Sequence, residues 1–410
     1  MAPIREWPAR LLHALIGPDA DGVRDGFVAL LISSGGDLLA GVTLGSIQHT
    51  LEQLPGLLVL IPAAIGMRGN IFGALGSRLG TSIHTGTFTL SRRRSTVVGQ
   101  NLLAAVTLTF VVSLALAALA KSIALAFNLQ SISLLDFVVI SMVGGIVSSV
   151  VVLAITVGVA AGSARYGWDM DSVAAPVITA AGDMVTLPSL FLATYCVNVR
   201  FLSPFLGAAT AGLAAVSVVG VVRSGLPLLR RIVAESLPIL LAAGAIDIIA
   251  GISIEKRLAA FTTLPALLVL VPPFLEDTGA LGGILAARLS SKLHLGVIEP
   301  VARPQRAARA DFRLIAVYAV PVFTLVAVSS DLVSLLLGLA SPGPVRMIAI
   351  SLIGGLLATI SCVGITYYGA IVAYRLGLDP DNHGIPLVTS SMDLIGAVAL
   401  IFAILIVRVG

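Results

Sequence analysis

Charge is scarce in this chain. Asp, Glu, Lys and Arg make up 11% of its 410 residues, against about a quarter in an ordinary soluble domain, while 57% of the residues are hydrophobic. A soluble globular domain is therefore excluded. Cysteine is scarcer still, since only Cys196 and Cys362 occur and both fall within apolar runs. Two such thiols argue against a disulfide framework and against a zinc site.

Aromatic residues are also few, at 5% of the chain, and no basic stretch is interleaved with them. A nucleic-acid partner is therefore not expected. The formal net charge of +4 is better explained by membrane topology and by contact with the anionic headgroups of a lipid bilayer. The N-terminal stretch has no signal-peptide cleavage pattern.

What the chain has in abundance is internal repetition. A shift of 210 residues places Leu54 on Leu264 and Asp183 on Asp393. The same offset, without a gap, aligns five further pairs: Gly69 with Gly279, Arg78 with Arg288, His84 with His294, Arg165 with Arg375, and Pro176 with Pro386. So many matches at one offset identify a duplicated unit.

The unit is a membrane unit, because its apolar runs are long enough to cross about 30 Å of hydrocarbon, which takes about 20 helical residues. The first copy has five such runs, near 26–48, 56–76, 97–120, 134–162 and 171–198. The second has five more, near 236–258, 266–286, 313–338, 346–372 and 382–408. One further run, near 203–222, belongs to neither copy and gives both copies the same orientation.

We therefore predict an all-α integral membrane protein of about 11 transmembrane helices, with two parallel five-helix repeats related by a pseudo-two-fold axis. Its expected parts are a short cytoplasmic segment (1–25), a first repeat (26–199), a linker helix (200–228) and a second repeat (229–410). Most Arg and Lys residues then fall in loops on the side of the N-terminus. The positive-inside rule accordingly predicts a multi-pass plasma-membrane protein with its N-terminus in the cytoplasm and its C-terminus outside.

Two aspartates lie midway along equivalent predicted helices, Asp183 in the first copy and Asp393 in the second. A charge at the centre of a lipid-exposed helix costs about 2.5–3.5 kcal/mol on insertion scales, so such residues usually face protein or water. Each aspartate shares a helix face with a Thr four residues earlier and a Pro seven residues earlier: Thr179 and Pro176, and Thr389 and Pro386. In a pseudo-two-fold arrangement both carboxylates can point into one central pathway.

Such a stripe offers oxygen ligands only. Hard divalent cations bind oxygen, and Mg²⁺ is typically held by one or two carboxylates while it keeps several waters. Softer metals are disfavoured because no thiolate or imidazole cluster competes. The structural alternative is that each aspartate caps a neighbouring helix or meets an Arg within the bundle.

A second equivalent pair, Asp37 and Asp247, lies in the first helix of each copy. These residues form either a site for an entering or coupling ion, such as Na⁺, or polar contacts between helices.

The second helix differs in charge between the copies, with Arg68 in one and Glu276 and Asp277 in the other. We hypothesise that Arg68 pairs with one of these acids. The Pro and clustered Gly of this helix predict that it is broken or closely packed.

In these motifs the chain resembles the MgtE-type magnesium channels and their two-repeat relatives, solute carrier family 41. The resemblance rests on the segment from Pro62 through Arg68, Gly69 and Asn70, and on the segment from Asp171 to Asp183 with its echo from Asp381 to Asp393. It implies a pore aspartate on the fifth helix, matching Asp183 and Asp393, with an Asn of the second helix nearby, matching Asn70. The second copy departs from the pattern because Ala280 replaces that Asn.

The predicted function is divalent-cation transport, with Mg²⁺ as the expected ion, by a protein that is not an enzyme. The metal-binding candidates are Asp183, Asp393, Asn70, Thr179, Thr389, Asp37 and Asp247. A channel and a Na⁺- or H⁺-coupled exchanger both fit. The alternative is a Na⁺- or H⁺-coupled transporter of a small organic solute, although the carboxylate stripe lacks the aromatic contacts of such a pocket. An intramembrane hydrolase is disfavoured because Ala180 stands where a Gly-x-Gly-Asp motif has Gly. The duplication is compatible with a monomer and leaves a homodimer open.

Overall fold

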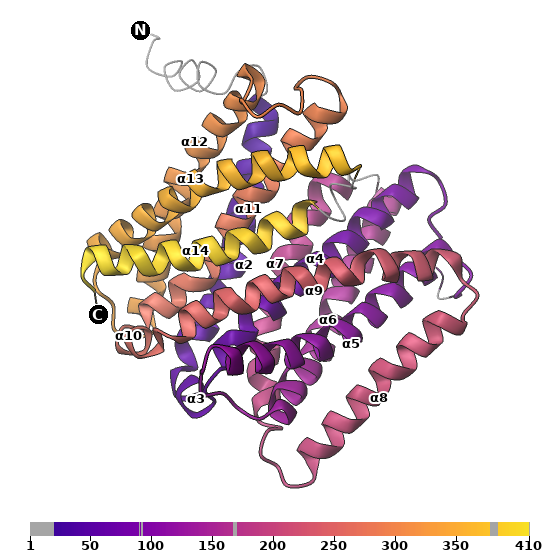
Figure 1. Cartoon of the computed structure of the whole chain (residues 1–410), viewed down its shortest axis with the longest axis horizontal. Helices are drawn as coiled ribbons and strands as arrows, with labels where there is room; N and C mark the ends of the chain where they lie inside the picture. Colours follow the sequence, from indigo (N-terminus) through magenta and orange to yellow (C-terminus); the bar gives the residue numbers. More distant parts are fainter. Residues whose placement is uncertain (1–19, 90, 92, 167–169, 378–383, 410) are drawn as a thin grey trace.

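The structure is a computed structural model that describes residues 20–89, 91, 93–166, 170–377 and 384–409. Every regular element in these ranges is a helix (Figure 1). The first repeat comprises α2 (Ala20–Ser46), α4 (Leu57–His84), α5 (Val97–Ala126), α6 (Leu134–Tyr166) and α7 (Met170–Thr194). The second comprises α9 (Pro227–Glu255), α11 (Ala266–His294), α12 (Arg306–Leu336), α13 (Pro344–Leu376) and α14 (Ile385–Val407).

All eleven predicted helices are present, and the eleventh, α8 (Leu202–Arg223), connects the two repeats. Among the described residues, ten helices are apolar and long enough to span a membrane, and α2 contributes a shorter apolar part, Leu30–Ser46. The all-α membrane fold is thereby confirmed. The expected N-terminal segment, 1–25, lies mostly outside the described residues, and α2 begins within it at Ala20.

Several helix ends lie beyond the predicted ones. Helix α9 begins at Pro227 rather than near residue 236, and α11 continues to His294 rather than ending near 286. Pro227 occupies the first turn of its helix, where its missing N–H costs nothing. Both extensions carry basic residues, among them Arg230 and Lys292, because hydropathy marks where a helix leaves the hydrocarbon rather than where it ends. The second helix is not broken, since α4 and α11 run through Pro62 and Pro272.

Two short helices went unpredicted, α3 (Gln48–Gln53) and α10 (Leu258–Thr263). Their starting residues differ by the same offset as the rest of the duplication. Each of them connects the first long helix of its repeat to the second. The structural repeat therefore extends into the connecting loops.

The first helix of each repeat packs against the other repeat. Helix α2 lies against α11 and α12, while α9 lies against α4 and α5. Within its own repeat each contacts the fifth helix, α7 for α2 and α14 for α9. The two repeats are thus interlocked by an exchange of their first helices, which pass through the middle of the bundle in Figure 1.

Glycine makes this exchange possible. A Cβ atom built on Gly41 of α2 would lie 2.1 Å from the carbonyl oxygen of Val269 in α11. In the equivalent crossing, a Cβ on Gly251 of α9 would lie 2.6 Å from the carbonyl oxygen of Leu58 in α4. Side chains larger than hydrogen do not fit at these points, so the helices cross in backbone contact.

Helix α8 lies at the edge of the bundle, against α5 and α6 (Figure 1). Only a few of its residues are buried, among them Gly207, Thr210 and Ala214. It therefore acts as the added crossing between two repeats of like orientation, and it takes no part in the centre of the protein.

One end of the second repeat is held by an ion cluster that the first repeat lacks. The buried carboxylate of Asp311 accepts hydrogen bonds from Arg288 Nε at 2.9 Å and from Lys292 Nζ at 2.6 Å. At the equivalent place, Asn101 Oδ1 accepts from Arg78 Nε at 2.8 Å. The residue equivalent to Lys292 is Ser82. The first repeat thus keeps the hydrogen bond to the Arg but has one negative and one positive charge fewer.

We expect Asp311→Asn to lower the free energy of unfolding by about 1–2 kcal/mol, because it removes the counter-charge of Lys292 while both basic side chains remain partly exposed to solvent. Thermal unfolding in detergent measures the change. The double variant Asp311→Asn/Lys292→Ser recreates the first repeat's arrangement, and it should recover most of the loss. No recovery would show that Lys292 is not the reason for the cost.

Candidate functional site

Four aspartates are buried near the middle of the bundle, each on a different helix. Asp37 of α2 is 0% exposed, Asp183 of α7 and Asp247 of α9 are 1% exposed, and Asp393 of α14 is 7% exposed. Burying an ionised carboxylate without a partner is costly, so such groups normally hold a cation, a proton or a hydrogen-bond donor. The bundle therefore contains four acids that require compensation.

These aspartates form two equivalent pairs. Asp37 lies next to Asp183, and Asp247 lies next to Asp393 and Ser390. Each pair joins the first helix of a repeat to the fifth helix of that repeat. Both carboxylates of a pair only accept hydrogen bonds when they are ionised, so a proton or a cation must lie with them. The pairs are the part of the predicted site that the structure brings together.

The carboxylate oxygens are poorly supplied with donors. Both oxygens of Asp37, both oxygens of Asp247 and one oxygen of Asp183 are buried without a well-aligned hydrogen bond. Native proteins rarely leave buried polar atoms in this state without a ligand, an ion or a functional reason. The unsatisfied oxygens thus identify the place in the described structure that is most in need of positive charge.

Glycines of the second helices let the pairs lie against the backbone. A Cβ on Gly66 of α4 would lie 2.9 Å from an oxygen of Asp247, and one on Gly279 of α11 would lie 3.3 Å from an oxygen of Asp393. Gly66 belongs to the first repeat and Asp247 to the second, so the helix exchange builds this contact. The close packing predicted for the second helix is confirmed here.

Helix α11 brings two further acids that sequence reasoning did not assign to the site. Asp277 is 0% exposed, and both of its oxygens lie close to Ser34 Oγ of α2. Glu276 lies near Asp37, Asp183, Asp247 and Asp393. The signal in the sequence was two adjacent acids inside an apolar run, at positions that are Gly66 and Met67 in the other copy.

Of the remaining predicted ligands, Thr389 lies beside Asp393, because a Cβ on Gly279 of α11 would approach the side chains of both. Thr389 Oγ1 donates to the carbonyl of Pro386 at 3.0 Å, so its hydrogen is used within its own helix. Thr179 is half-buried on α7. Asn70 lines a hollow with Arg78 of its own helix, Ser236 of α9 and Pro386 of α14. The side chain of Pro176 lies outside the description.

The hypothesis that Arg68 pairs with Glu276 or Asp277 is wrong. Arg68 is fully buried, and its Nε donates to Ser148 Oγ of α6 at 3.0 Å. Within the described residues its terminal nitrogens have no hydrogen-bond partner, and one of them lies against Gly145. In the second repeat the ring of Phe323 packs on the equivalent glycine, Gly355. The Arg68 side chain thus fills a volume that an aromatic ring fills in the other copy.

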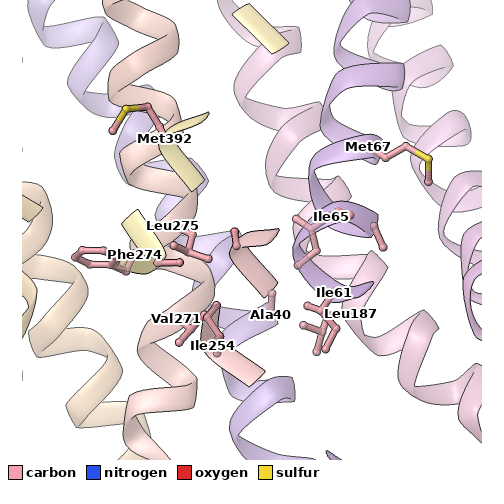
Figure 2. Packing of buried hydrophobic residues seen from close by; sticks show 14 of the residues in the cluster. Ala40, Ile61, Ile65, Met67, Leu187, Ile254, Val271, Phe274, Leu275 and Met392 are labelled. Atoms are coloured by element: carbon pink, nitrogen blue, oxygen red, sulfur yellow. The ribbon is translucent and has the colours of Figure 1, made fainter. Parts of the chain in front are cut away.

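A small cavity lies between the repeats beside Glu276 and Asp393. It has room for about one or two water molecules. Apart from the two acids its walls are apolar, and they come from α2, α4, α9, α11 and α14. Figure 2 shows Ile61 and Ile65 of α4 on one side, with Ile254, Val271 and Leu275 on the other. These side chains close the approach to the acids from the end where α4 and α11 begin.

Within the described residues, no three carboxylate, imidazole or thiolate side chains converge closely enough to form a direct metal site. The acids instead lie as two pairs, with Glu276 near both. Such spacing suits an ion that retains part of its water shell better than one held by a closed set of protein ligands.

A sequence model of the MgtE family, described as a divalent cation transporter, matches residues 61–193 and 271–403. Together these two regions cover more than half of the chain, one in each repeat. Each includes the buried aspartate of the fifth helix, Asp183 or Asp393. No solved structure matches the chain.

Curated relatives match over nearly the whole length. Solute carrier family 41 member 3 of Rattus norvegicus is 26% identical over 92% of this chain and 86% of its own length. Solute carrier family 41 member 2 of Gallus gallus is 26% identical over 91% of this chain and 68% of its own length. The human member 2 is 25% identical over 91% of this chain and 68% of its own length.

Proposed function

This chain belongs to the MgtE family of divalent cation transporters, and from that premise we propose that it moves Mg²⁺ along a pathway between its two repeats, past Asp183 and Asp393. The observation that carries the proposal is the pair of carboxylate pairs, buried at equivalent places in the two repeats, with oxygens that lack hydrogen-bond donors. Mg²⁺ supplies the positive charge that these oxygens need, and it is commonly held by only one or two carboxylates.

The arrangement also suggests how the ion is selected. Asp183 and Asp393 belong to the fifth helices, and each is accompanied by an aspartate of a first helix, Asp37 or Asp247. A divalent ion between such pairs neutralises two carboxylates, whereas a monovalent ion neutralises one. The stronger Coulomb interaction in a site of low dielectric favours the divalent ion, provided that it keeps enough water.

In this structure the pathway is closed. The apolar side chains around the cavity, among them Ile61, Ile65, Val271 and Leu275, leave no room for an ion with six water molecules. We propose that transport requires α4 and α11 to move apart at this end. Apolar constrictions of this kind gate ion pathways by excluding water.

The alternative substrate, a small organic solute, has little support. The cavity next to the acids is lined almost entirely by aliphatic side chains, with few groups that could hydrogen-bond an organic ligand. Its lining also contains no aromatic side chain. The proposed cargo is therefore an ion.

We further propose that the protein lies in the plasma membrane with its N-terminus in the cytoplasm. The support is the position of Arg78, Arg165, Arg223, Lys292 and Arg375, all near helix ends that this topology places inside. We propose the monomer as the transporting unit, because one chain supplies both halves of the pathway.

Proteoliposomes that contain purified protein and an entrapped Mg²⁺ indicator test the proposal. We expect protein-dependent Mg²⁺ uptake down an imposed Mg²⁺ gradient. Repeating the assay with opposing Na⁺ and pH gradients identifies coupling, because flux through a channel ignores those gradients while an exchanger requires one of them. Absence of Mg²⁺ uptake under every gradient, in liposomes where the protein is shown to be folded, contradicts the proposal.

A further inference from the structure

Arg68 is a buried positive charge that the proposed pathway does not use. It is 0% exposed within the membrane-spanning helix α4, and its Nε donates to Ser148 Oγ of α6. That hydroxyl donates its own hydrogen to the carbonyl of Gly144 at 2.9 Å. Among the described residues, no carboxylate forms an ion pair with Arg68 and neither terminal nitrogen has a hydrogen-bond partner. Most of the donors of this guanidinium are therefore unused.

A second donor without a partner lies beside the guanidinium. Ser113 Oγ of α5 is buried and has no hydrogen-bond partner within the described part of the chain. A Cβ built on Gly145 of α6 would lie 2.5 Å from Arg68 Nη2 and 2.7 Å from Ser113 Oγ, so both atoms lie against the same point of α6. Native proteins rarely bury donors in this way without an acceptor. The place where α4, α5 and α6 meet therefore needs an acceptor that these side chains do not supply.

The second repeat is apolar at the same place. The residues equivalent to Arg68, Ala64 and Ser113 are Thr278, Phe274 and Phe323. The two phenyl rings pack together with their centroids 5.1 Å apart, and Phe323 covers Gly355, the equivalent of Gly145. The first repeat thus has one guanidinium where the second repeat has two aromatic rings.

The backbone is alike in the two places. Ser141 Oγ of α6 donates to the carbonyl of Ser113 at 2.7 Å, and the equivalent Ser351 Oγ of α13 donates to the carbonyl of Phe323 at 2.7 Å. Helices α5 and α6 therefore meet as α12 and α13 do. Because the side chains between them are smaller in the first repeat, that repeat has volume beside Arg68 for a small ligand.

We propose that a chloride ion binds where α4, α5 and α6 meet, held by the guanidinium of Arg68 and the hydroxyl of Ser113. Both groups donate hydrogen bonds, and one of them carries a positive charge, as an anion requires. A water molecule accepts hydrogen bonds but leaves the buried charge of Arg68 uncompensated, whereas an anion also neutralises it. The anion is small and monovalent, because the site has a single positive charge between closely packed helices.

The bound anion also affects the neighbouring fifth helix. A Cβ built on Gly182 of α7 would lie 3.7 Å from Cβ of Arg68, and Gly182 directly precedes Asp183. An uncompensated positive charge on Arg68 repels a cation at Asp183, and chloride offsets that charge. This consequence for transport rests on the proposed function, whereas binding of the anion does not.

Thermal unfolding of the full chain in detergent tests the site. Chloride replaces gluconate, an anion too large for the site, at constant Na⁺ concentration and ionic strength. A ligand that binds only the folded protein raises the midpoint, so we expect a saturable rise with chloride. Ser113→Ala should raise the half-saturating chloride concentration about tenfold, because hydrogen bonds to charged groups are among the stronger ones. Arg68→Met should abolish the response.

Ser330→Ala is the matched control. Ser330 Oγ is likewise buried without a partner among the described residues, but it belongs to α12 of the second repeat, so its loss should leave the chloride response unchanged. Equal midpoints in chloride and gluconate overturn the inference. A chloride response that persists unchanged in both Ser113→Ala and Arg68→Met places the ion elsewhere and overturns it as well. Mg²⁺ uptake is measured separately, so the transport proposal can survive or fail independently.

Discussion

Asp183→Asn and Asp393→Asn are each expected to reduce the initial rate of Mg²⁺ uptake into proteoliposomes by about 100-fold or more at subsaturating Mg²⁺. This loss corresponds to about 2.8 kcal/mol, at 1.4 kcal/mol per tenfold change. Asn keeps the shape of the side chain and removes its charge. Both carboxylates are buried in a region of low dielectric. The Coulomb attraction between one carboxylate and a divalent ion is therefore stronger there than in water.

The bundle itself should tolerate both substitutions, because removal of one of two neighbouring carboxylates relieves repulsion. Size-exclusion profiles and thermal midpoints are therefore expected to match those of the unmodified protein. Asp331→Asn is the control for a generic loss of a buried acid. Asp331 is 3% exposed on α12, away from the pathway, and it accepts a hydrogen bond from Ser341 that Asn can also accept. Uptake within about twofold of normal in both pathway variants would show that Asp183 and Asp393 are not part of the proposed site.

Gly41→Val and Gly251→Val are expected to have the largest effects on stability. A Cβ at either position would overlap a carbonyl oxygen of the helix that crosses it, and a backbone atom cannot move aside as a flexible side chain does. The crossing helices must then separate along their length. Overpacking usually costs about 1–3 kcal/mol, and we expect about 3 kcal/mol for each variant. The midpoint of thermal unfolding measures this loss.

Gly35→Val on the same helix as Gly41 provides the control. No atom lies within 4 Å of a Cβ built on Gly35, so the substitution should change stability by no more than about 0.5 kcal/mol. Equal destabilisation by Gly35→Val and Gly41→Val would mean that the cost arises from changing glycine within a helix. A large difference between them identifies the helix crossing as its cause.

The fold was largely predictable because the membrane imposes it. Apolar runs of sufficient length must be helical, and the duplication shows which helices correspond. The prediction of the eleven long helices needed only hydropathy and the offset between Leu54 and Leu264. Helix ends such as Pro227 and His294 were missed because they lie where the chain has already left the hydrocarbon.

The site was predictable only in part. Charge inside an apolar run identified Asp37, Asp183, Asp247 and Asp393, and the structure brings these residues together as pairs. Sequence could not show that each first helix crosses to the other repeat, because the exchange depends on packing. Glu276 and Asp277 were accordingly assigned a pairing with Arg68.

The exchange of first helices has a consequence for the order of synthesis. Helix α2 is made before the helices of the other repeat that it packs against, because α11 and α12 follow the whole first repeat and α8 in the sequence. During translation α2 therefore remains in the membrane with an unfilled contact surface at Gly41. The first repeat completes its structure only when the second has been inserted, so assembly of the pathway is the last step for both halves of the protein.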